Sequence, residues 1–187
     1  FSMTSSDLRI ILSPAKKMVT DRDTFPVDGL PEFLADARRL WAHIRGLSYA
    51  EAKALWNCSD SLAELNRERF IHMDLDQGLT PALIAYEGIQ YQYLSPKTLE
   101  EDALSWLSEH LYILSGFYGI LRPFEGVAPY RLEMQAALEL EGSRNLYEFW
   151  GDRIYRSLLL DRRENTVILN LASREYAKAV EPYLKPE

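Results

Sequence analysis

The stretch Leu111–Met134, LYILSGFYGILRPFEGVAPYRLEM, joins two kinds of local sequence. It begins with an apolar run, Leu111 to Leu114, of the length and composition that a buried strand requires. The glycines and prolines that follow disfavour both a helix and a central strand. We therefore predict a strand that runs into an ordered loop, where binding groups are often held. A tight structural connection with solvated arginines would use the same residue types.

Three other apolar runs are predicted to be strands: Leu8–Leu12, Ala82–Ala85 and Thr166–Leu171. Amphipathic helical patterns lie between the runs, and this alternation is typical of an α/β fold. We expect a mixed or mostly parallel sheet that is flanked by helices. Residues from about 30 to 70 show helical patterns without an intervening strand, so we expect a helical insertion there.

Several helix starts are indicated by capping boxes, in which a small polar residue is followed three positions later by Glu. Pro31 suits the first turn of the helix that opens the insertion. Ser173 is predicted to cap the last helix, which should run through Val180. The capping pairs are Ser48 with Glu51, Ser61 with Glu64, Thr98 with Glu101 and Asn145 with Glu148.

The composition fits one compact domain. Of 187 residues, 47% are hydrophobic, and we expect a single domain from residue 8 onward, with residues 1–7 as a leader or a remnant of cloning. The net charge of −7 disfavours indiscriminate binding to nucleic acid or anionic membranes, so any nucleic-acid site must be a local basic patch. No apolar run approaches the ~20 residues of a membrane span, and no secretory signal is recognisable. We expect a cytoplasmic protein that does not bind membranes.

The sequence contains no pattern of a metal site or of a common catalytic motif. Its one cysteine, Cys58, lies in no zinc motif and the three histidines are scattered, so we expect neither a metal nor a cofactor. Nucleotide-binding and hydrolase motifs are also absent. The one weak catalytic candidate is Glu133, which an extended PYRLEM segment would place on the same face as Arg131. Glu133 could act as a general base, although an ion pair with Arg131 is the favoured interpretation.

Three predicted strands end in a serine: Ser13, Ser115 and Ser173. In open α/β sheets, ligands bind outside the carboxyl ends of the strands, so we expect these serines to line one crevice. Basic side chains nearby would make it a site for phosphate or another anion. Each serine alone is more simply explained as a turn or helix N-cap. The anion-binding candidates at this edge are Ser13, Lys16, Ser115, Gly116, Arg122, Tyr130, Arg131, Asn170 and Ser173.

The helical insertion contains a second candidate, the turn Ile44–Ser48 with the sequence IRGLS. It resembles a helix-hairpin-helix element in which Ser48 replaces the usual second glycine. Such hairpins present backbone amides to a DNA phosphate without reading the base sequence. The candidate DNA-binding residues are Arg45, Gly46 and Ser48. A plain two-helix turn, with Gly46 as the C-cap and Ser48 as the next N-cap, explains the same residues.

Five sequence blocks, in order across most of the chain, are similar to those of one known family. They are LSPAKKM from Leu12, LSGFYGILRP from Leu114, PYRLEM from Pro129, LYEFWGDRI from Leu146 and LNLASREYAKAV from Leu169. Together they resemble the YaaA peroxide-stress family of bacterial cytoplasmic proteins. The resemblance implies a role in the response to peroxide and binding of double-stranded DNA through a helix-hairpin-helix element and a basic cleft.

The same resemblance indicates one difference. Family members continue past the equivalent of Lys178 into a further C-terminal segment with a basic motif, so we expect this chain to be short at that end.

The leading hypothesis is therefore DNA binding in the response to peroxide, as the resemblance implies. The main rival is an enzyme that acts on a phosphorylated small molecule or nucleotide in the strand-end crevice. A third hypothesis is an interaction protein in which the crevice is purely structural. Because catalytic motifs are absent, we favour binding over catalysis. A DNA binder should lose affinity steeply with salt, which separates the first hypothesis from the second.

Overall fold

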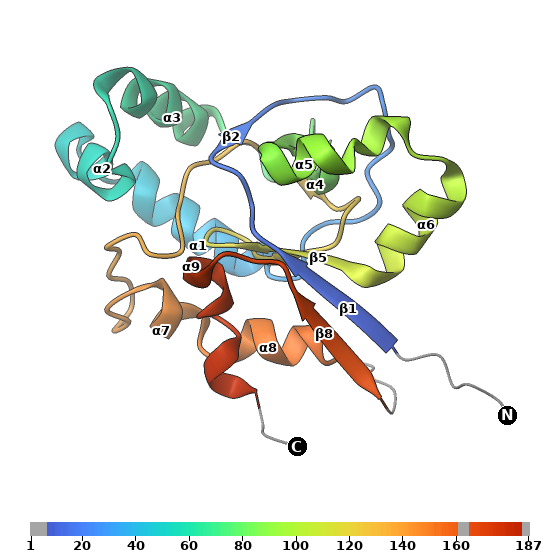
Figure 1. Ribbon diagram of the computed structural model, residues 1–187. Helices are drawn as coiled ribbons and strands as arrows, with labels where there is room; N and C mark the ends of the chain where they lie inside the picture. Colours follow the sequence, from blue (N-terminus) through green and yellow to red (C-terminus); the bar gives the residue numbers. More distant parts are fainter. Residues whose placement is uncertain (1–6, 161–164, 185–187) are drawn as a thin grey trace, which may run out of the picture.

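The computed structural model of the protein describes residues 7–160 and 165–184. The strands of its central sheet are β1 (Asp7–Leu12), β5 (Leu111–Ser115), β6 (Gly119–Leu121) and β8 (Thr166–Asn170). Their order is β6–β5–β1–β8 (Figure 1). β1 pairs in parallel with β5 and with β8, whereas β6 runs antiparallel to β5. The predicted α/β fold with a mixed, mostly parallel sheet is confirmed.

Three of the four predicted strands are present, and the apolar runs of two of them, β1 and β5, fill the interior. All five residues of β5 are buried, and so are the last four residues of β1, from Arg9 to Leu12. A parallel strand with both faces covered has a continuous apolar run instead of an alternating one. The central position of β1 and β5 therefore follows from their sequences.

The fourth predicted strand, Ala82–Ala85, is wrong, because these residues form a single helical turn, α4. All four are buried, and a short apolar run does not distinguish a buried helical turn from a buried strand. Two-residue strands, β3 (Thr80–Pro81) and β4 (Tyr86–Glu87), flank α4. β3 pairs with β7 (Gly126–Val127) and β4 pairs with β2 (Lys17–Met18), both antiparallel.

The stretch after β5, predicted to be a loop, contains β6 and β7. Gly119 has φ +79°, a conformation that favours glycine, and it starts the return from β5 into β6. An added Cβ at Gly119 would lie 2.9 Å from the ring of Trp150, and the Trp150 indole N–H donates to the Gly116 carbonyl at 3.0 Å. The turn is therefore packed directly against α7 (Leu146–Trp150). β6 lies at the sheet edge.

The predicted helical insertion is confirmed. α1 (Leu34–Arg45), α2 (Tyr49–Trp56) and α3 (Asp60–His72) follow one another without an intervening strand (Figure 1). Their buried side chains join the core that covers the sheet, and Ala37 and Leu40 of α1 are fully buried. The insertion is thus packed on the α/β unit.

Two of the four predicted capping pairs are present. The Ser48 Oγ accepts the Glu51 N–H at 3.1 Å, and the Glu51 carboxylate accepts the Ser48 N–H at 3.0 Å. At the start of α7, the Asn145 side chain accepts the Glu148 N–H at 2.9 Å. Each cap satisfies donors that the first turn of a helix leaves unpaired.

The other two helix starts differ from the prediction. α3 follows Ser59, whose Oγ accepts a backbone N–H at 3.4 Å, instead of Ser61. α6 (Glu101–His110) follows Glu100, because Thr98 belongs to a preceding 3-10 turn. Capping spacing alone does not identify the cap when two candidate residues lie close together.

The remaining helices are short. α9 (Arg174–Ala177) begins after Ser173 as predicted, but it ends before Val180, and the Ser173 side chain makes no capping bond. None of the helices in the described residues is long and apolar enough to cross a membrane. The other short elements are α5 (Ile89–Leu94), α8 (Arg153–Leu158), η1 (Pro96–Thr98) and η2 (Glu181–Tyr183).

The close contact at Gly116 gives a first prediction. An added Cβ there would lie 2.6 Å from the Leu132 carbonyl oxygen, so Gly116→Ala should lower the free energy of unfolding in urea by about 1–3 kcal/mol. Gly46→Ala is the matched control, because its Cβ would meet nothing closer than 3.5 Å and its φ is −80°. The control should change stability by less than about 1 kcal/mol. Equal effects of the two substitutions would contradict the packing described.

Candidate functional site

Two of the predicted strand-end serines bind each other. Ser13 follows β1 and Ser173 follows β8, and the Ser13 Oγ accepts the Ser173 N–H at 2.7 Å. The Ser13 hydroxyl donates to the Ser173 Oγ at 3.2 Å, and the Ser13 carbonyl accepts the Tyr91 hydroxyl at 2.7 Å. These polar groups connect the ends of β1 and β8 to α5. Ser13 and Ser173 therefore make their hydrogen bonds with groups of the protein itself.

The third serine, Ser115, is fully buried in a chain of hydroxyl groups. Its Oγ accepts the backbone N–H groups of Phe117 and Tyr118 at 3.2 and 2.9 Å and lies 2.6 Å from the Tyr130 hydroxyl. The Tyr130 hydroxyl lies 2.7 Å from that of Tyr86. Burial raises the pKa of Tyr130 to about 12, and it also raises the pKa of Tyr86 well above its usual value. Both phenols therefore stay neutral near pH 7, and this network holds the PYRLEM segment on β5.

Alternating burial along the PYRLEM segment places Leu132 in the core and Arg131 and Glu133 on the less buried face, as an extended segment should. The predicted ion pair between Arg131 and Glu133 is wrong. The Glu133 carboxylate lies 3.0 Å from the Lys16 ammonium, and the Arg131 guanidinium donates two bonds of 3.2 Å to the Trp56 carbonyl. Arg131 therefore binds the end of α2.

A second carboxylate lies close to Lys16. Burial raises the pKa of the Glu175 carboxyl, and the charge of Glu133 raises it further, while Lys16 lowers it. Lys16 thus pairs with Glu133, and its charge also acts on the Glu175 carboxyl, at the edge where β1 and β8 end. This charge balance disfavours a phosphate beside Lys16.

Two more predicted residues lie at this edge in structural roles. The Gly116 carbonyl accepts the Trp150 indole N–H. The Asn170 side chain accepts the Ala172 N–H at 3.0 Å and reaches the Glu181 carboxylate at 3.5 Å. The structure therefore brings Ser13, Lys16, Asn170 and Ser173 to the carboxyl edge, but their polar side-chain atoms are bound by other groups of the protein.

Arg122 does not reach this edge. β6 runs antiparallel to β5 with Leu121 opposite Ile113, so the chain has returned toward the start of β5 when it arrives at Arg122. The Arg122 guanidinium lies 4.5 Å from the centre of the Tyr112 ring and donates to the Tyr112 hydroxyl at 2.9 Å. The expected grouping of Arg122 with Lys16 and Arg131 is therefore wrong.

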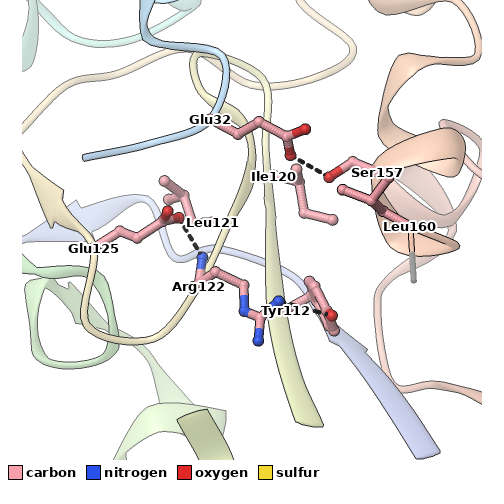
Figure 2. A pocket seen from close by; sticks show the side chains of 8 residues that line it. All are labelled: Glu32, Tyr112, Ile120, Leu121, Arg122, Glu125, Ser157 and Leu160. Atoms are coloured by element: carbon pink, nitrogen blue, oxygen red, sulfur yellow. Dashed lines mark hydrogen bonds between the residues drawn. The ribbon is translucent and has the colours of Figure 1, made fainter. Parts of the chain in front are cut away.

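Arg122 instead lines a cavity of about 120 Å³ that the sequence did not indicate (Figure 2). Glu125 accepts the Arg122 N–H at 2.7 Å, and Glu32 is hydrogen-bonded to the Ser157 hydroxyl. Burial raises the pKa of Glu125 to about 7; the Arg122 N–H and guanidinium lower it, and the charges of Glu32 and Asp28 raise it further. The lining residues are Glu32, Tyr112, Ile120, Leu121, Arg122, Glu125, Ser157 and Leu160.

The Ile44–Ser48 turn has no free backbone amide. The Gly46 N–H donates to two α1 carbonyls at 3.2 Å, the Leu47 N–H donates to Ile44 at 3.1 Å, and the Ser48 N–H is bound by Glu51. The described geometry is a two-helix turn with a capping box, and it shows no helix-hairpin-helix element. Any ligand here must be bound by side chains.

Arg45 is exposed on α1, and its guanidinium lies 5.0 Å from the centre of the Trp41 ring. It forms no ion pair within the described part of the chain. Arg45 borders a groove of about 330 Å³ between α1 and the end of α3, which we call the α1–α3 groove. Its lining residues are Arg38, Trp41, Arg45, Ile71, His72, Met73, Asp74, Leu75 and Asp76.

The described residues contain no group of three or more His, Cys, Asp or Glu side chains that could hold a metal ion. Cys58 is a free, half-buried thiol.

Comparison with known proteins gives a consistent result. The family model described as peroxide stress protein YaaA matches residues 8–186. A UPF0246 protein of Lachnoclostridium phytofermentans is 53% identical over 177 residues, which are 95% of this chain and 68% of that protein. A UPF0246 protein of Lactiplantibacillus plantarum is 51% identical over 179 residues, 96% of this chain and 71% of that protein.

The Glu125 cavity gives a prediction about pH. Because burial raises the pKa from 4.5 to about 7, the folded state binds this proton more tightly than the unfolded chain. The protonated Glu125 carboxyl makes its full contribution to the free energy of unfolding below pH 4.5, and this contribution is lost as the pH rises through about 7. Between pH 4.5 and about 7, the free energy of unfolding of the unchanged protein should fall by about 3 kcal/mol, and Glu125→Gln should abolish this fall.

Urea unfolding at a series of pH values measures this effect, with Glu139→Gln as a control that removes an exposed carboxylate outside the cavity. A pH profile that Glu125→Gln leaves unchanged would contradict the described burial of Glu125.

Proposed function

The chain belongs to the peroxide stress protein YaaA family, and from this we propose that it acts in the response to peroxide by binding double-stranded DNA. The family resemblance motivates both the DNA and a cytoplasmic location. We propose that the DNA binds on the helical insertion, at the Arg45 side of the α1–α3 groove.

The main support for the proposal is that the Arg45 guanidinium is available to a ligand. This guanidinium is exposed, lies over the Trp41 ring and has no acidic partner among the described residues. A planar guanidinium is well suited to a phosphate, which it binds through two parallel N–H groups. The Trp41 indole N–H is bound to the Phe70 carbonyl at 2.8 Å, so the ring that supports Arg45 is held in place. Arg45 is thus a preorganised cation at the surface.

The charge distribution favours the same region. Residues 34–72 contain six Arg or Lys and five Asp or Glu, a net charge of +1, whereas the rest of the chain has a net charge of −8. Arg39, on the same helix, is neutralised by Asp36, and Arg38 is neutralised by Asp76. The insertion is therefore not acidic as a whole, and Arg45 is the cation of α1 that has no ion-pair partner among the described residues. Asp74 and Asp76 also line the α1–α3 groove, so we place the phosphate at Arg45 itself.

The mode of contact differs from that of a helix-hairpin-helix element. Because the amides of the Ile44–Ser48 turn are bound within the protein, the phosphate would be bound by side chains. Contacts of this kind hold the DNA backbone and do not read base sequence. We therefore propose binding with little sequence preference.

The rival function, an enzyme acting on a phosphorylated small molecule at the strand ends, has less support. Lys16 is bound to Glu133, Arg131 is bound to the Trp56 carbonyl, and Ser13 is bound to Ser173. A phosphate would have to displace these bonds and approach two carboxylates. A catalytic Glu133 would have to give up Lys16 to accept a proton.

Substitution of Arg45 tests the proposal. Arg45→Ala should weaken binding to double-stranded DNA of mixed sequence about equally for all sequences, by about 3- to 10-fold at low salt. The slope of the logarithm of the binding constant against the logarithm of salt concentration should fall by about one, since one phosphate contact is lost. Fluorescence anisotropy with labelled duplexes measures both quantities.

Arg144→Ala is the matched control. It removes the same charge from an exposed arginine, with a side-chain exposure of 82%, that pairs with Glu148 next to α7. The salt slope of this variant should match that of the unchanged protein. If both variants reduce binding equally, only net charge matters and the assignment of Arg45 fails. If neither variant binds differently while Lys16→Ala abolishes binding of a nucleotide, the rival function is favoured.

A further inference from the structure

The cavity lined by Arg122 contains two carboxylates that the proposed DNA binding does not use (Figure 2). Glu32 lies just before α1, and Glu125 lies in the turn between β6 and β7. Each accepts a hydrogen bond, Glu32 from the Ser157 hydroxyl and Glu125 from the Arg122 N–H. Among the described residues, neither carboxylate has an ion-pair partner.

The guanidinium of Arg122, which also lines the cavity, is bound to other groups. It donates to the Tyr112 hydroxyl at 2.9 Å and to the Ser108 carbonyl at 3.1 Å, and it lies 4.5 Å from the centre of the Tyr112 ring. Glu125 is bound by the backbone N–H of Arg122 at 2.7 Å (Figure 2). The side chain of Arg122 therefore lines the cavity without forming an ion pair with either carboxylate.

The charges around Glu125 favour a cation in the cavity. The pKa of Glu125 is raised to about 7, chiefly by burial and also by the charges of Glu32 and Asp28, while Arg122 lowers it. A carboxylate that is removed from water without a counter-charge is costly, and either a proton or a bound cation removes this cost. Above pH 7, the cavity therefore has more negative than positive charge.

The rest of the lining and the size of the cavity limit what the cation is. Ile120, Leu121 and Leu160 supply apolar side chains, so the ligand needs an apolar part as well as a charge. The volume is about 120 Å³. An engineered apolar cavity of about 150 Å³ holds a benzene molecule, so this cavity suits a ligand of about five non-hydrogen atoms.

The same lining disfavours a metal ion and an anion. The described residues contain no group of three or more His, Cys, Asp or Glu side chains that could hold a metal ion. Hard divalent cations take about six oxygen ligands, of which this cavity offers few. An anion would be repelled by Glu32 and Glu125. An ammonium group on a short alkyl chain fits both the carboxylates and the apolar side chains.

We propose that the cavity formed by Glu32, Glu125 and the apolar side chains of β6 is a binding site for a primary alkylammonium ion of about four carbons. The ammonium would donate hydrogen bonds to Glu32 and Glu125, and the alkyl chain would pack against Ile120 and Leu160. The lining residues of this cavity and of the α1–α3 groove do not overlap, so this inference is independent of the proposed DNA binding.

The test follows amide chemical shifts of the ¹⁵N-labelled 187-residue chain while n-butylammonium is added. Residues 120–125 and Ser157 should show saturable shift changes. 1-Butanol, which has nearly the same shape and no charge, should bind at least about 10-fold more weakly, because it lacks the charge-assisted hydrogen bonds. Binding of n-butylammonium should tighten about 10-fold from pH 6 to pH 8, as Glu125 loses its proton.

Three variants identify the site. Glu32→Gln and Glu125→Gln should each weaken binding of n-butylammonium at least about 10-fold at pH 8, because each removes one charged acceptor. Glu125→Gln should also remove the pH dependence of binding. Glu139→Gln is the matched control, since it removes an exposed carboxylate outside the cavity, and it should bind normally. Circular dichroism checks the fold of the variants, and the comparison of the amine with the alcohol needs none of them.

Four results would overturn the inference. The first is the absence of saturable shift changes in residues 120–125 and Ser157. The second is equal binding of 1-butanol and n-butylammonium, which would indicate an apolar cavity that does not select for charge. The third is equal weakening by all three variants, which would indicate an effect of net charge alone. The fourth is tighter binding of Mg²⁺ than of n-butylammonium at the same residues, which would indicate a metal site.

Discussion

The parallel pairing of β1 with β5 on one side and β8 on the other determines where the other groups of the molecule lie. It joins strands that are about a hundred residues or more apart in the sequence, and it brings their carboxyl ends to one edge. Several polar groups at that edge are buried, among them Ser13 and Ser115, and buried polar groups need hydrogen-bond partners. The bonds of Ser13 with Ser173, and of Ser115 with Tyr130, satisfy this requirement inside the protein. In open α/β sheets, ligands bind outside the carboxyl ends of the strands. Polar groups lie at that edge here, but they are already hydrogen-bonded within the protein.

The sequence predicts the strands of the sheet well where burial on both faces makes the apolar run continuous, as in β1 and β5. It fails at Ala82–Ala85, because four buried apolar residues fit a helical turn as well as a strand. The position of Arg122 could not be predicted either, since it depends on β6 turning back along β5, and the glycines around it suggested a loop. Local signals identify an element more reliably than they identify the direction in which the chain leaves it.

Partners far apart in sequence are the least predictable part of the site. Glu133 was expected to pair with its neighbour Arg131, but Lys16 reaches it from more than a hundred residues away. Glu32 and Glu125 come together only through the cavity of Figure 2, and no spacing in the sequence indicates it. The turn at Gly46 is the opposite case: its caps were readable, and the same caps occupy the amides that a DNA phosphate would require. A hairpin that presented these amides to a phosphate would have to give up the caps.

The strand-end groups serve the structure, and we propose that the α1–α3 groove is the surface available to an anionic partner. Amide chemical shifts of the ¹⁵N-labelled protein, followed while a short DNA duplex is added, test this claim most directly. We expect the largest shift changes around Trp41, Arg45 and His72, with Ser13, Lys16 and Ser173 unchanged. Changes confined to Ser13, Lys16 and Ser173, with none in α1, would contradict the account and return the site to the carboxyl edge of the sheet.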